Sequence, residues 1–585
     1  MKPTLLNFLL IVAASHATCQ PSPLDSEIAG RIAGTSAKVI RIGEIDVPLS
    51  ADGGFRFKTE LESPRILSAK VGTMTWSIFL APGKLVELEV EGIDVSTLKY
   101  TGDLASSNSC LKKLCTLDAG TDEFFNNNWT SLHAQDESRF IAVIDSVKMQ
   151  YLGYVIAYQT EAKDVVPDFV KLIRAEINFG FNALVIDYPE TRRRMTGERL
   201  TLSPAGRNYL NAVSIDDTTL MHVEAFQKYC RKWIDYNADL LVSMRDGRRH
   251  YNLRKMDVLP KVLSSVFSSS ELRDFWYSEY LREHIENAGP ANSGEYVEVF
   301  DRICANGVYR QKIDRLYASA LDSESDHVVK CFKTAYDFKL HAHIFYPEHF
   351  VHGDRIPAIV IFHGGGFVLG NPSWAFGKAR HYAHMGLIAI AAQYRLSNFR
   401  DVTPIEAIQD AKDLMIWLRQ NKDTLGICAD KIATSGWSVG AQLCATLAVF
   451  PDTLPHSNVH SSPNALLLTS PGTGTRGWFA ELLRGTKVNP QDYSPIDHVR
   501  PGLPPTIILQ GRDDTVTPLE DVKLFHDRLT ENGDYCEMWT YDGVGHLFTP
   551  TYLGDSGWPQ PDEKVQAEAD QRSDEFLAKF GFLGQ

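Results

Sequence analysis

The sequence is poor in cysteine and has almost no long apolar run. Nine cysteines stand among 585 residues, with no C-x-x-C pair and no Cys/His cluster at the spacing of a structural metal site. Beyond the N-terminus, no segment reaches the roughly 18 uncharged apolar residues that a membrane-spanning helix needs. We therefore expect no metal and no cofactor, and no membrane crossing after the first residues.

An excess of basic residues is also absent. The chain has 59 basic and 73 acidic residues and a formal net charge of −14. Nucleic acid is therefore excluded as a main partner, because neutralising phosphates requires a basic face. Hydrophobic residues make up 44% and charged residues 23%, the balance of a folded protein, and the length favours several domains.

The N-terminus has the pattern of a secretory signal peptide. Lys2 precedes an apolar run over residues 5–14, and Ser15-His16-Ala17 offers a small-residue cleavage site. We expect residues 1–19 to be a signal peptide and the protein to be exported to the periplasm, the cell surface or the medium. A lipid anchor at Cys19 is the alternative, although no aliphatic residue stands three positions before it.

Residues 27–103 have the texture of β-structure. Short apolar runs, most of them alternating, occupy residues 39–42, 54–58, 78–80 and 85–90, and the turn signals Asp52-Gly53-Gly54 and Pro82-Gly83 lie between them. Short strands at this spacing predict a small antiparallel β-sandwich.

Residues 104–325 change to helical spacing. Apolar residues recur along residues 140–155 and 169–173, and Ser203-Pro204 and Gly289-Pro290 interrupt the pattern. No fixed repeat period is present, which argues against a solenoid. The sequence therefore predicts an α-helical middle region.

These first two regions resemble part of a known arrangement. Gly30-x-Ile32, the turn at residues 52–57 and the run at residues 79–83 are similar to the N-terminal domain of exported Bacteroidetes-type proteins of the thioredoxin family. Those proteins carry a helical segment before their thioredoxin domain. Here no W-C-x-x-C follows, so the resemblance implies no redox activity.

Residues 326–585 predict an α/β layer fold. Continuous apolar runs at residues 358–362, 387–392, 465–468 and 506–509 are typical of parallel strands buried on both faces. Helical patterns stand between them, which predicts a mostly parallel sheet with helices on both faces. Residues 339–345 alternate, and we expect an edge strand there.

A serine stands where a strand leads directly into a helix. The stretch Gly436-Trp437-Ser438-Val439-Gly440 follows an apolar run and precedes a helical pattern. Glycines on both sides allow a sharp, strained turn that lifts the Ser438 hydroxyl clear of the sheet. This pattern predicts a nucleophile.

The remaining parts of an acyl-transfer site lie around it. His363-Gly364-Gly365-Gly366 ends the first buried strand, and its bare N–H groups could stabilise an oxyanion. Downstream, Asp513 and Asp514 follow one strand and His546 follows another, so that the order is Ser, Asp, His. A serine hydroxyl needs an imidazole base, which a carboxylate in turn orients.

These motifs resemble the esterase/lipase branch of the α/β-hydrolase superfamily that carries His-Gly-Gly-Gly and includes hormone-sensitive lipase and bacterial acetyl esterases. Tyr394-Arg395-Leu396 and the Gly511-x-x-Asp514 loop add to the likeness. The resemblance implies a catalytic triad and an oxyanion hole: the triad is Ser438, Asp514 and His546, and the hole is formed by Gly365, Gly366 and Val439. Asp514 is favoured over Asp513 because it is the fourth residue counting from Gly511, as in that family.

The prediction is a serine carboxylic-ester hydrolase that acts on short-chain or acetyl esters of small molecules or saccharides. Trp437 departs from the family pattern and is similar to the elbow of prolyl-oligopeptidase-type peptidases, which are the first alternative. A non-catalytic binding or scaffold protein with a relic hydrolase domain is the second. We also hypothesise that part of residues 104–325 leans over the active site.

Overall fold

The structure is a computed structural model that describes residues 24–43, 45–92, 94–196, 198, 200–246, 253–335, 338–351, 353–397, 402–484, 486–553 and 558–584. The expected signal peptide and Cys19 lie outside these residues. The chain divides into two compact units, Met1–Leu240 with Val262–Leu272 and Leu241–Lys261 with Arg273–Gln585. The predicted domain limits at residues 27–103, 104–325 and 326–585 stay a prediction.

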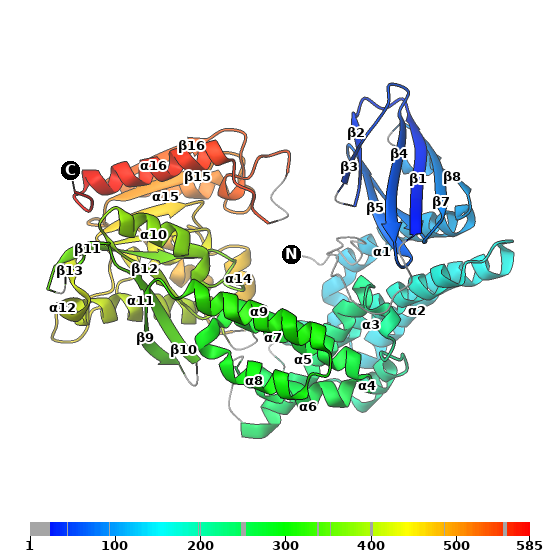
Figure 1. Ribbon diagram of the computed structural model, residues 1–585, viewed down its shortest axis with the longest axis horizontal. Helices are drawn as coiled ribbons and strands as arrows, with labels where there is room; N and C mark the ends of the chain where they lie inside the picture. The colour runs from blue at the N-terminus through cyan, green and yellow to red at the C-terminus, as the bar shows by residue number, and fades with distance from the viewer. Residues whose placement is uncertain are drawn as a thin grey trace. The chain divides into compact units, whose positions relative to one another are not determined.

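The first unit begins with the expected β-sandwich (Figure 1). One sheet has the order β4-β1-β7-β8 and the other the order β3-β2-β5-β6. All neighbours are antiparallel except β1 and β7, which are parallel. The strands are β1 (Leu24–Ala33), β2 (Val39–Ile42), β3 (Ile45–Pro48), β4 (Gly54–Leu61), β5 (Arg65–Val71), β6 (Met74–Leu80), β7 (Leu85–Glu91) and β8 (Lys99–Gly102), with the 3₁₀ turn η1 (Val95–Thr97).

The alternating residues of β4 show why the sandwich forms. Phe55 and Phe57 are buried between the sheets, while Arg56 and Lys58 face solvent. The turn before β4 requires glycine at Gly53, whose φ is +82° and where a Cβ would lie 2.1 Å from the carbonyl oxygen of Ile32. The Asp52-Gly53-Gly54 turn predicted from the sequence is therefore a place where the backbone at Gly53 packs closely against Ile32.

The helical middle region is confirmed and spans both units. Ser203 caps α4 by accepting the N–H of Gly206, and α7 ends at Ala288 before Gly289, where φ is +78°. The helices are α1 (Ala105–Ala134), α2 (Glu137–Glu161), α3 (Pro167–Thr196), α4 (Pro204–Asn211), α5 (Glu224–Asp246), α6 (Leu253–Val266), α7 (Ser270–Ala288), α8 (Gly294–Ile303) and α9 (Gly307–Ser323), with η2 (Thr218–Leu220) and η3 (Pro290–Asn292).

Among the described helices, α2 alone is long and apolar enough to cross a membrane by length and composition. A core helix of a globular protein meets the same criterion. In the first unit α2 contacts α1 and α3, and its side chains Phe140, Ile144 and Tyr151 are buried. The expectation that no later segment crosses a membrane stays a prediction.

The second unit contains a large, mostly parallel sheet, as expected. Its order is β16-β15-β14-β13-β11-β12-β10-β9, and only β9 and β10 run antiparallel to their neighbours. The strands are β9 (Val328–Ala335), β10 (Phe338–Phe345), β11 (Ile356–Phe362), β12 (Ile388–Ala392), β13 (Ile427–Trp437), β14 (Ala465–Thr469), β15 (Thr506–Gly511) and β16 (Cys536–Tyr541).

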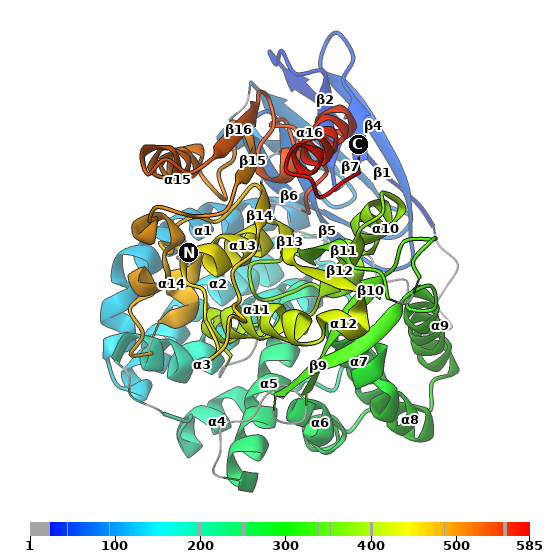
Figure 2. The same cartoon turned by 90° about the vertical axis from the view of Figure 1, so that its left-hand side faces the viewer.

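Helices cover both faces of this sheet (Figure 2). One face packs against α11, α13, α14 and α15, and the other against α10 and α16. The strands are buried on both faces because their residues are apolar without alternation, as in β11 and β12. The elements are η4 (Pro372–Ala375), α10 (Phe376–His384), α11 (Pro404–Gln420), α12 (Lys422–Leu425), α13 (Val439–Val449), α14 (Trp478–Leu483), η5 (Pro490–Tyr493), η6 (Pro495–His498), α15 (Leu519–Glu531), η7 (His546–Phe548) and α16 (Glu563–Lys579).

The expected edge strand at residues 339–345 is wrong. The edge is β9, and β10 lies between β9 and β12. The alternating His341 and His343 suggested a solvent face, but both are buried. His343 hydrogen-bonds to His327 over 2.9 Å, and burial lowers the pKa of His343 to about 3. A neutral imidazole with a hydrogen-bond partner fits an interior strand.

Candidate active site

The backbone at Ser438 is strained. Ser438 stands between the end of β13 and the start of α13 with φ 54° and ψ −123°, a region that favours glycine. A Cβ at Gly440 would lie 2.1 Å from the carbonyl oxygen of Phe362, and one at Gly436 would lie 2.4 Å from Gly440. Only glycine fits at these two positions, and the turn therefore packs against the end of β11.

The structure brings Ser438, His546 and Asp514 together. The Nε2 atom of His546 is 3.1 Å from Ser438 Oγ, and its Nδ1 atom is 2.9 Å from Asp514 Oδ2. A carboxylate only accepts hydrogen bonds, so Nδ1 carries the proton and Nε2 is free to accept the hydroxyl proton of Ser438. All three side chains are buried.

The Asp514 carboxylate is held by its own loop. Oδ1 accepts the N–H groups of Val516 and Thr517 at 2.9 and 2.7 Å, and Oδ2 accepts the Thr517 hydroxyl and the Gln510 amide. Burial alone would raise the pKa of Asp514, but the hydrogen bonds from His546 and Thr517 outweigh it and hold the pKa below its usual range. Asp514 is therefore ionised at neutral pH.

Asp513, the alternative carboxylate, lies elsewhere. Its side chain is exposed, and Oδ2 accepts the N–H of Gly543 at 3.2 Å. The structure thus places Asp514 beside the imidazole and Asp513 at the surface. Two other histidines of this domain, His498 and His526, bond to Ser494 and Asp527.

The loop that carries His546 is also strained. Leu547 and Phe548 in η7 have φ values of 51° and 62°, and the N–H of Leu547 donates to Ser470 Oγ at 3.1 Å. Ser470 follows β14 and has φ 43°. The ends of neighbouring parallel strands therefore meet at one edge of the sheet, where ligands of open α/β sheets bind.

The glycine run after β11 forms a tight loop. Gly365 and Gly366 have φ values of 116° and 63°, and Gly365 accepts the N–H groups of Val368 and Leu369. Within the described part of the chain, the N–H groups of Gly365 and Gly366 donate to no protein acceptor. The N–H of Val439 lies at the N-terminus of α13, where backbone donors and the helix dipole favour negative charge.

Comparison with known proteins places this fold in a family. Residues 359–480 match a family model described as alpha/beta hydrolase fold. The matched segment contains the glycine loop and Ser438. The C-terminal part of this chain is an alpha/beta hydrolase domain.

Individual relatives of the hydrolase domain include esterases. The chain is 26% identical over 196 residues to the probable carboxylic ester hydrolase LipM of Mycobacterium tuberculosis, covering 30% of this chain and 45% of LipM. It is 24% identical over 200 residues to endo-1,4-beta-xylanase B of Butyrivibrio fibrisolvens, covering 31% of each protein. The chain thus spans less than half the length of both curated relatives.

A solved structure is also similar. The native esterase Est2 of Thermogutta terrifontis is 31% identical, with a TM-score of 0.40, and the match covers 45% of this chain and 95% of that chain.

His363 of the hydrolase domain has a supporting role. It is fully buried, stacks on Tyr394 with 4.4 Å between ring centroids, and donates from Nδ1 to the carbonyl oxygen of Gly364 at 2.7 Å. Burial lowers the pKa of His363 to about 4. The ring is therefore neutral at pH 7 and fixes the start of the glycine loop.

Sequence reasoning missed Trp478. Its indole Nε1–H donates to the carbonyl oxygen of Gly366 at 2.5 Å, and a Cβ at Gly366 would lie 3.1 Å from the ring. No motif marks this tryptophan, because it begins a six-residue helix far along the sequence from the loop. Trp437, which departs from the family pattern, lies against Gly364, where a Cβ would meet its indole at 2.7 Å.

Among the described residues, no group of three or more His, Cys, Asp or Glu side chains could hold a metal ion. The arrangement can supply a nucleophile, a base and a set of backbone donors.

Proposed function

We propose that the hydrolase domain is a serine carboxylic-ester hydrolase. Ser438 Oγ attacks the ester carbonyl while His546 accepts the hydroxyl proton, and the resulting oxyanion accepts hydrogen bonds from Gly365, Gly366 and Val439. The intermediate collapses to an acyl-enzyme, and His546 gives its proton to the departing alcohol. Water then attacks the acyl group with His546 as base, which releases the acid and restores Ser438.

The hydrogen-bonded series from Ser438 through His546 to Asp514 carries this proposal. A buried carboxylate that stays ionised stabilises the imidazolium formed at each proton transfer. The strained turn at Ser438 supports it further, because such strain persists at functional sites.

For the substrate, we propose short-chain or acetyl esters, with a small molecule or a saccharide as the alcohol. The similarity to LipM supports an ester, and the similarity to a xylanase is the reason to include a saccharide alcohol.

The test compares esters with amides. We expect the full chain to hydrolyse p-nitrophenyl acetate and acetylated xylo-oligosaccharides faster than peptide p-nitroanilides, and Ser438→Ala to abolish turnover without unfolding. Preference for the anilides would favour the peptidase alternative. Absence of turnover with all three substrates would favour a relic domain.

A further inference from the structure

We propose that Asn287, at the end of α7, is a positioning residue for the oxyanion loop, defined here as residues 363–370. This inference rests on the proposed ester hydrolysis. The side-chain Oδ1 of Asn287 accepts the N–H of Gly370 at 3.2 Å. A helix that precedes the hydrolase sheet in the sequence thereby holds the loop that supplies the oxyanion donors.

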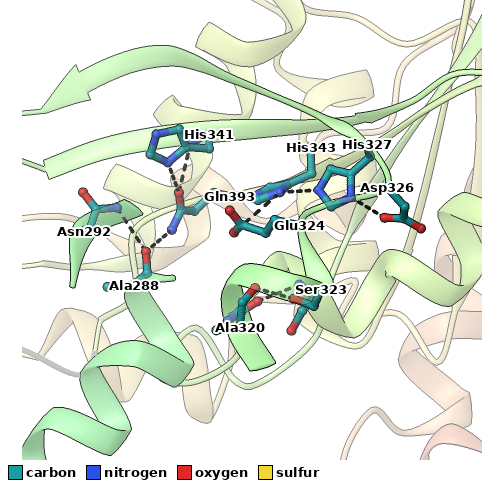
Figure 3. Close-up of polar contacts among 12 residues, drawn as sticks. Ala288, Asn292, Ala320, Ser323, Glu324, Asp326, His327, His341, His343 and Gln393 are labelled. Atoms are coloured by element: carbon teal, nitrogen blue, oxygen red, sulfur yellow. Dashed lines mark hydrogen bonds and ion pairs between the residues drawn. The ribbon is translucent and has the colours of Figure 1, made fainter. Parts of the chain in front are cut away.

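The last turn of α7 is anchored to the hydrolase domain on both sides of Asn287. The side chain of Asn371 donates to the carbonyl oxygen of Glu286 at 2.6 Å, and Gln393 donates to that of Ala288 at 3.1 Å. Figure 3 shows Gln393 between this carbonyl and β10, where its Oε1 accepts the N–H of His341 at 3.0 Å. Asn287 therefore stands on a fixed support.

The orientation of the Asn287 amide is also fixed. Its Nδ2 donates to the carbonyl oxygen of Glu283 within α7 at 2.8 Å, so Oδ1 is the atom turned towards Gly370. Both the oxygen and the nitrogen of the amide are hydrogen-bonded, and a side chain without the amide would lose both bonds.

The oxyanion loop closes on itself, so that a shift at Gly370 reaches its start. A Cβ at Gly370 would lie 2.6 Å from Nδ1 of His363 and 3.0 Å from the carbonyl oxygen of Gly364. One at Gly365 would lie 2.0 Å from the carbonyl oxygen of Leu369. The last residues of the loop, Leu369 and Gly370, therefore pack against its first residues, and Gly365, one of the proposed oxyanion donors, is part of this contact.

The expected effect is on the chemical step. Backbone donors stabilise the oxyanion only when they are aimed at the position it takes in the transition state, and a displacement of about 1 Å can cost about 10²-fold in rate. Asn287 holds Gly370 and not the substrate. We therefore expect Asn287→Leu, which is close in shape but has no acceptor, to lower kcat about 10-fold with KM changed less than about twofold.

Asn292→Leu is the matched control. Asn292 also joins the helices to the sheet, because its Nδ2 donates to the carbonyl oxygens of Ala288 and Lys339 at 3.0 and 3.1 Å. It makes no contact with the oxyanion loop in the described part of the chain. We expect this variant to keep kcat, whatever it does to the melting temperature.

The experiment measures p-nitrophenyl acetate kinetics and the inhibition constant of a trifluoromethyl ketone, whose adduct with Ser438 presents an oxyanion. The full chain is used throughout, with melting curves for every variant. Asn287→Leu should raise the inhibition constant in step with the loss in kcat/KM, and Asn287→Asp, which keeps an acceptor for Gly370, should recover most of the rate. If Asn287→Leu does not fold, Asn287→Ala replaces it.

Two results would overturn the proposal: unchanged kcat in a folded Asn287 truncation, or an equal loss in Asn292→Leu. A wild-type chain without ester turnover would instead refute the proposed function, so the two failures are distinguishable.

Discussion

The β-sandwich and the catalytic loops use the backbone differently. In the described residues of the sandwich, positive φ occurs only at glycines, such as Gly53 and Gly83. The described non-glycine residues with positive φ all lie in the hydrolase domain, and besides His456 they surround the site: Phe367, Ser438, Ser470, Leu547 and Phe548.

The strained residues gather at the proposed active site. Each such residue costs about 1–3 kcal/mol and persists only where the surrounding structure enforces it. In the hydrolase domain a sheet buried on both faces fixes the strand ends from which these loops leave. Every described residue of the sandwich that has positive φ is a glycine, so its described backbone carries no comparable strain.

The largest effect is expected at Asp514. Asp514→Asn should lower kcat about 10³- to 10⁴-fold, because the amide can stabilise neither the imidazolium nor the required tautomer of His546. Asp513→Asn should change kcat less than about twofold, since Asp513 is exposed and one residue outside the site. Steady-state kinetics with p-nitrophenyl acetate measures both. Equal losses of kcat in the two variants would contradict the assignment of Asp514, and not Asp513, to the proposed site.

A smaller effect is expected at Trp478. Trp478→Phe keeps an aromatic ring beside Gly366 but removes the indole N–H that donates to its carbonyl oxygen. We expect kcat to fall about 3- to 10-fold, the value of one net hydrogen bond of about 1 kcal/mol acting on the loop. Trp558→Phe, at another exposed tryptophan of the same domain, is the control. If both variants have wild-type kinetics, the contact does not position the loop.

Backbone strain itself can be measured at Ser438. Ser438→Gly and Ser438→Ala both lack the hydroxyl, but only glycine relieves φ 54°, ψ −123°. We expect the glycine variant to be more stable than the alanine variant by about 1 kcal/mol. In the sandwich the order should reverse: at the exposed residue Glu60 of β4, Glu60→Gly should be less stable than Glu60→Ala by about 0.5–1 kcal/mol. Calorimetry that finds the same order at both positions would contradict the comparison.

The sandwich and the second unit should also differ in their response to pH. Burial raises the pKa of Glu324 to about 7. A carboxyl whose folded pKa exceeds its unfolded value stabilises the fold while protonated, and this stability is lost as pH rises from about 4.5 to about 7. In the sandwich, hydrogen bonds from Arg41 and Ser50 lower the pKa values of exposed Asp46 and Asp52, so no such loss is expected there.

Glu324→Gln tests this difference. From pH 5 to pH 8 the melting temperature of the second unit, which contains Glu324, should fall less in the variant than in the wild type, by several degrees at most. His343, 4.0 Å from Glu324, has a pKa lowered by burial to about 3 and acts in the opposite direction, with stability lost as pH falls below about 6.5. The exposed Glu348→Gln is the control. Parallel curves for all three proteins would exclude a buried acid at this position.

Local patterns in the sequence predicted the parallel strands, because uninterrupted apolar runs are a local signal. The turn motifs after these strands also predicted that Ser438, Asp514 and His546 lie at strand ends. The local patterns missed that β10 is interior, since a hydrogen-bonded histidine reads as polar although it is buried. The contacts of Trp478 and Asn287 with the glycine loop were not predicted for a different reason. Their partners lie 112 and 83 positions away along the chain, and no periodicity records such contacts.

The central claim is that Ser438 is a nucleophile activated by His546. Incubation of the full chain with a fluorophosphonate probe, followed by peptide mass analysis, tests it most directly. We predict one adduct, on the peptide that contains Ser438, and its loss in His546→Ala. A folded wild-type chain that takes no label, or takes it on another residue, would contradict the account.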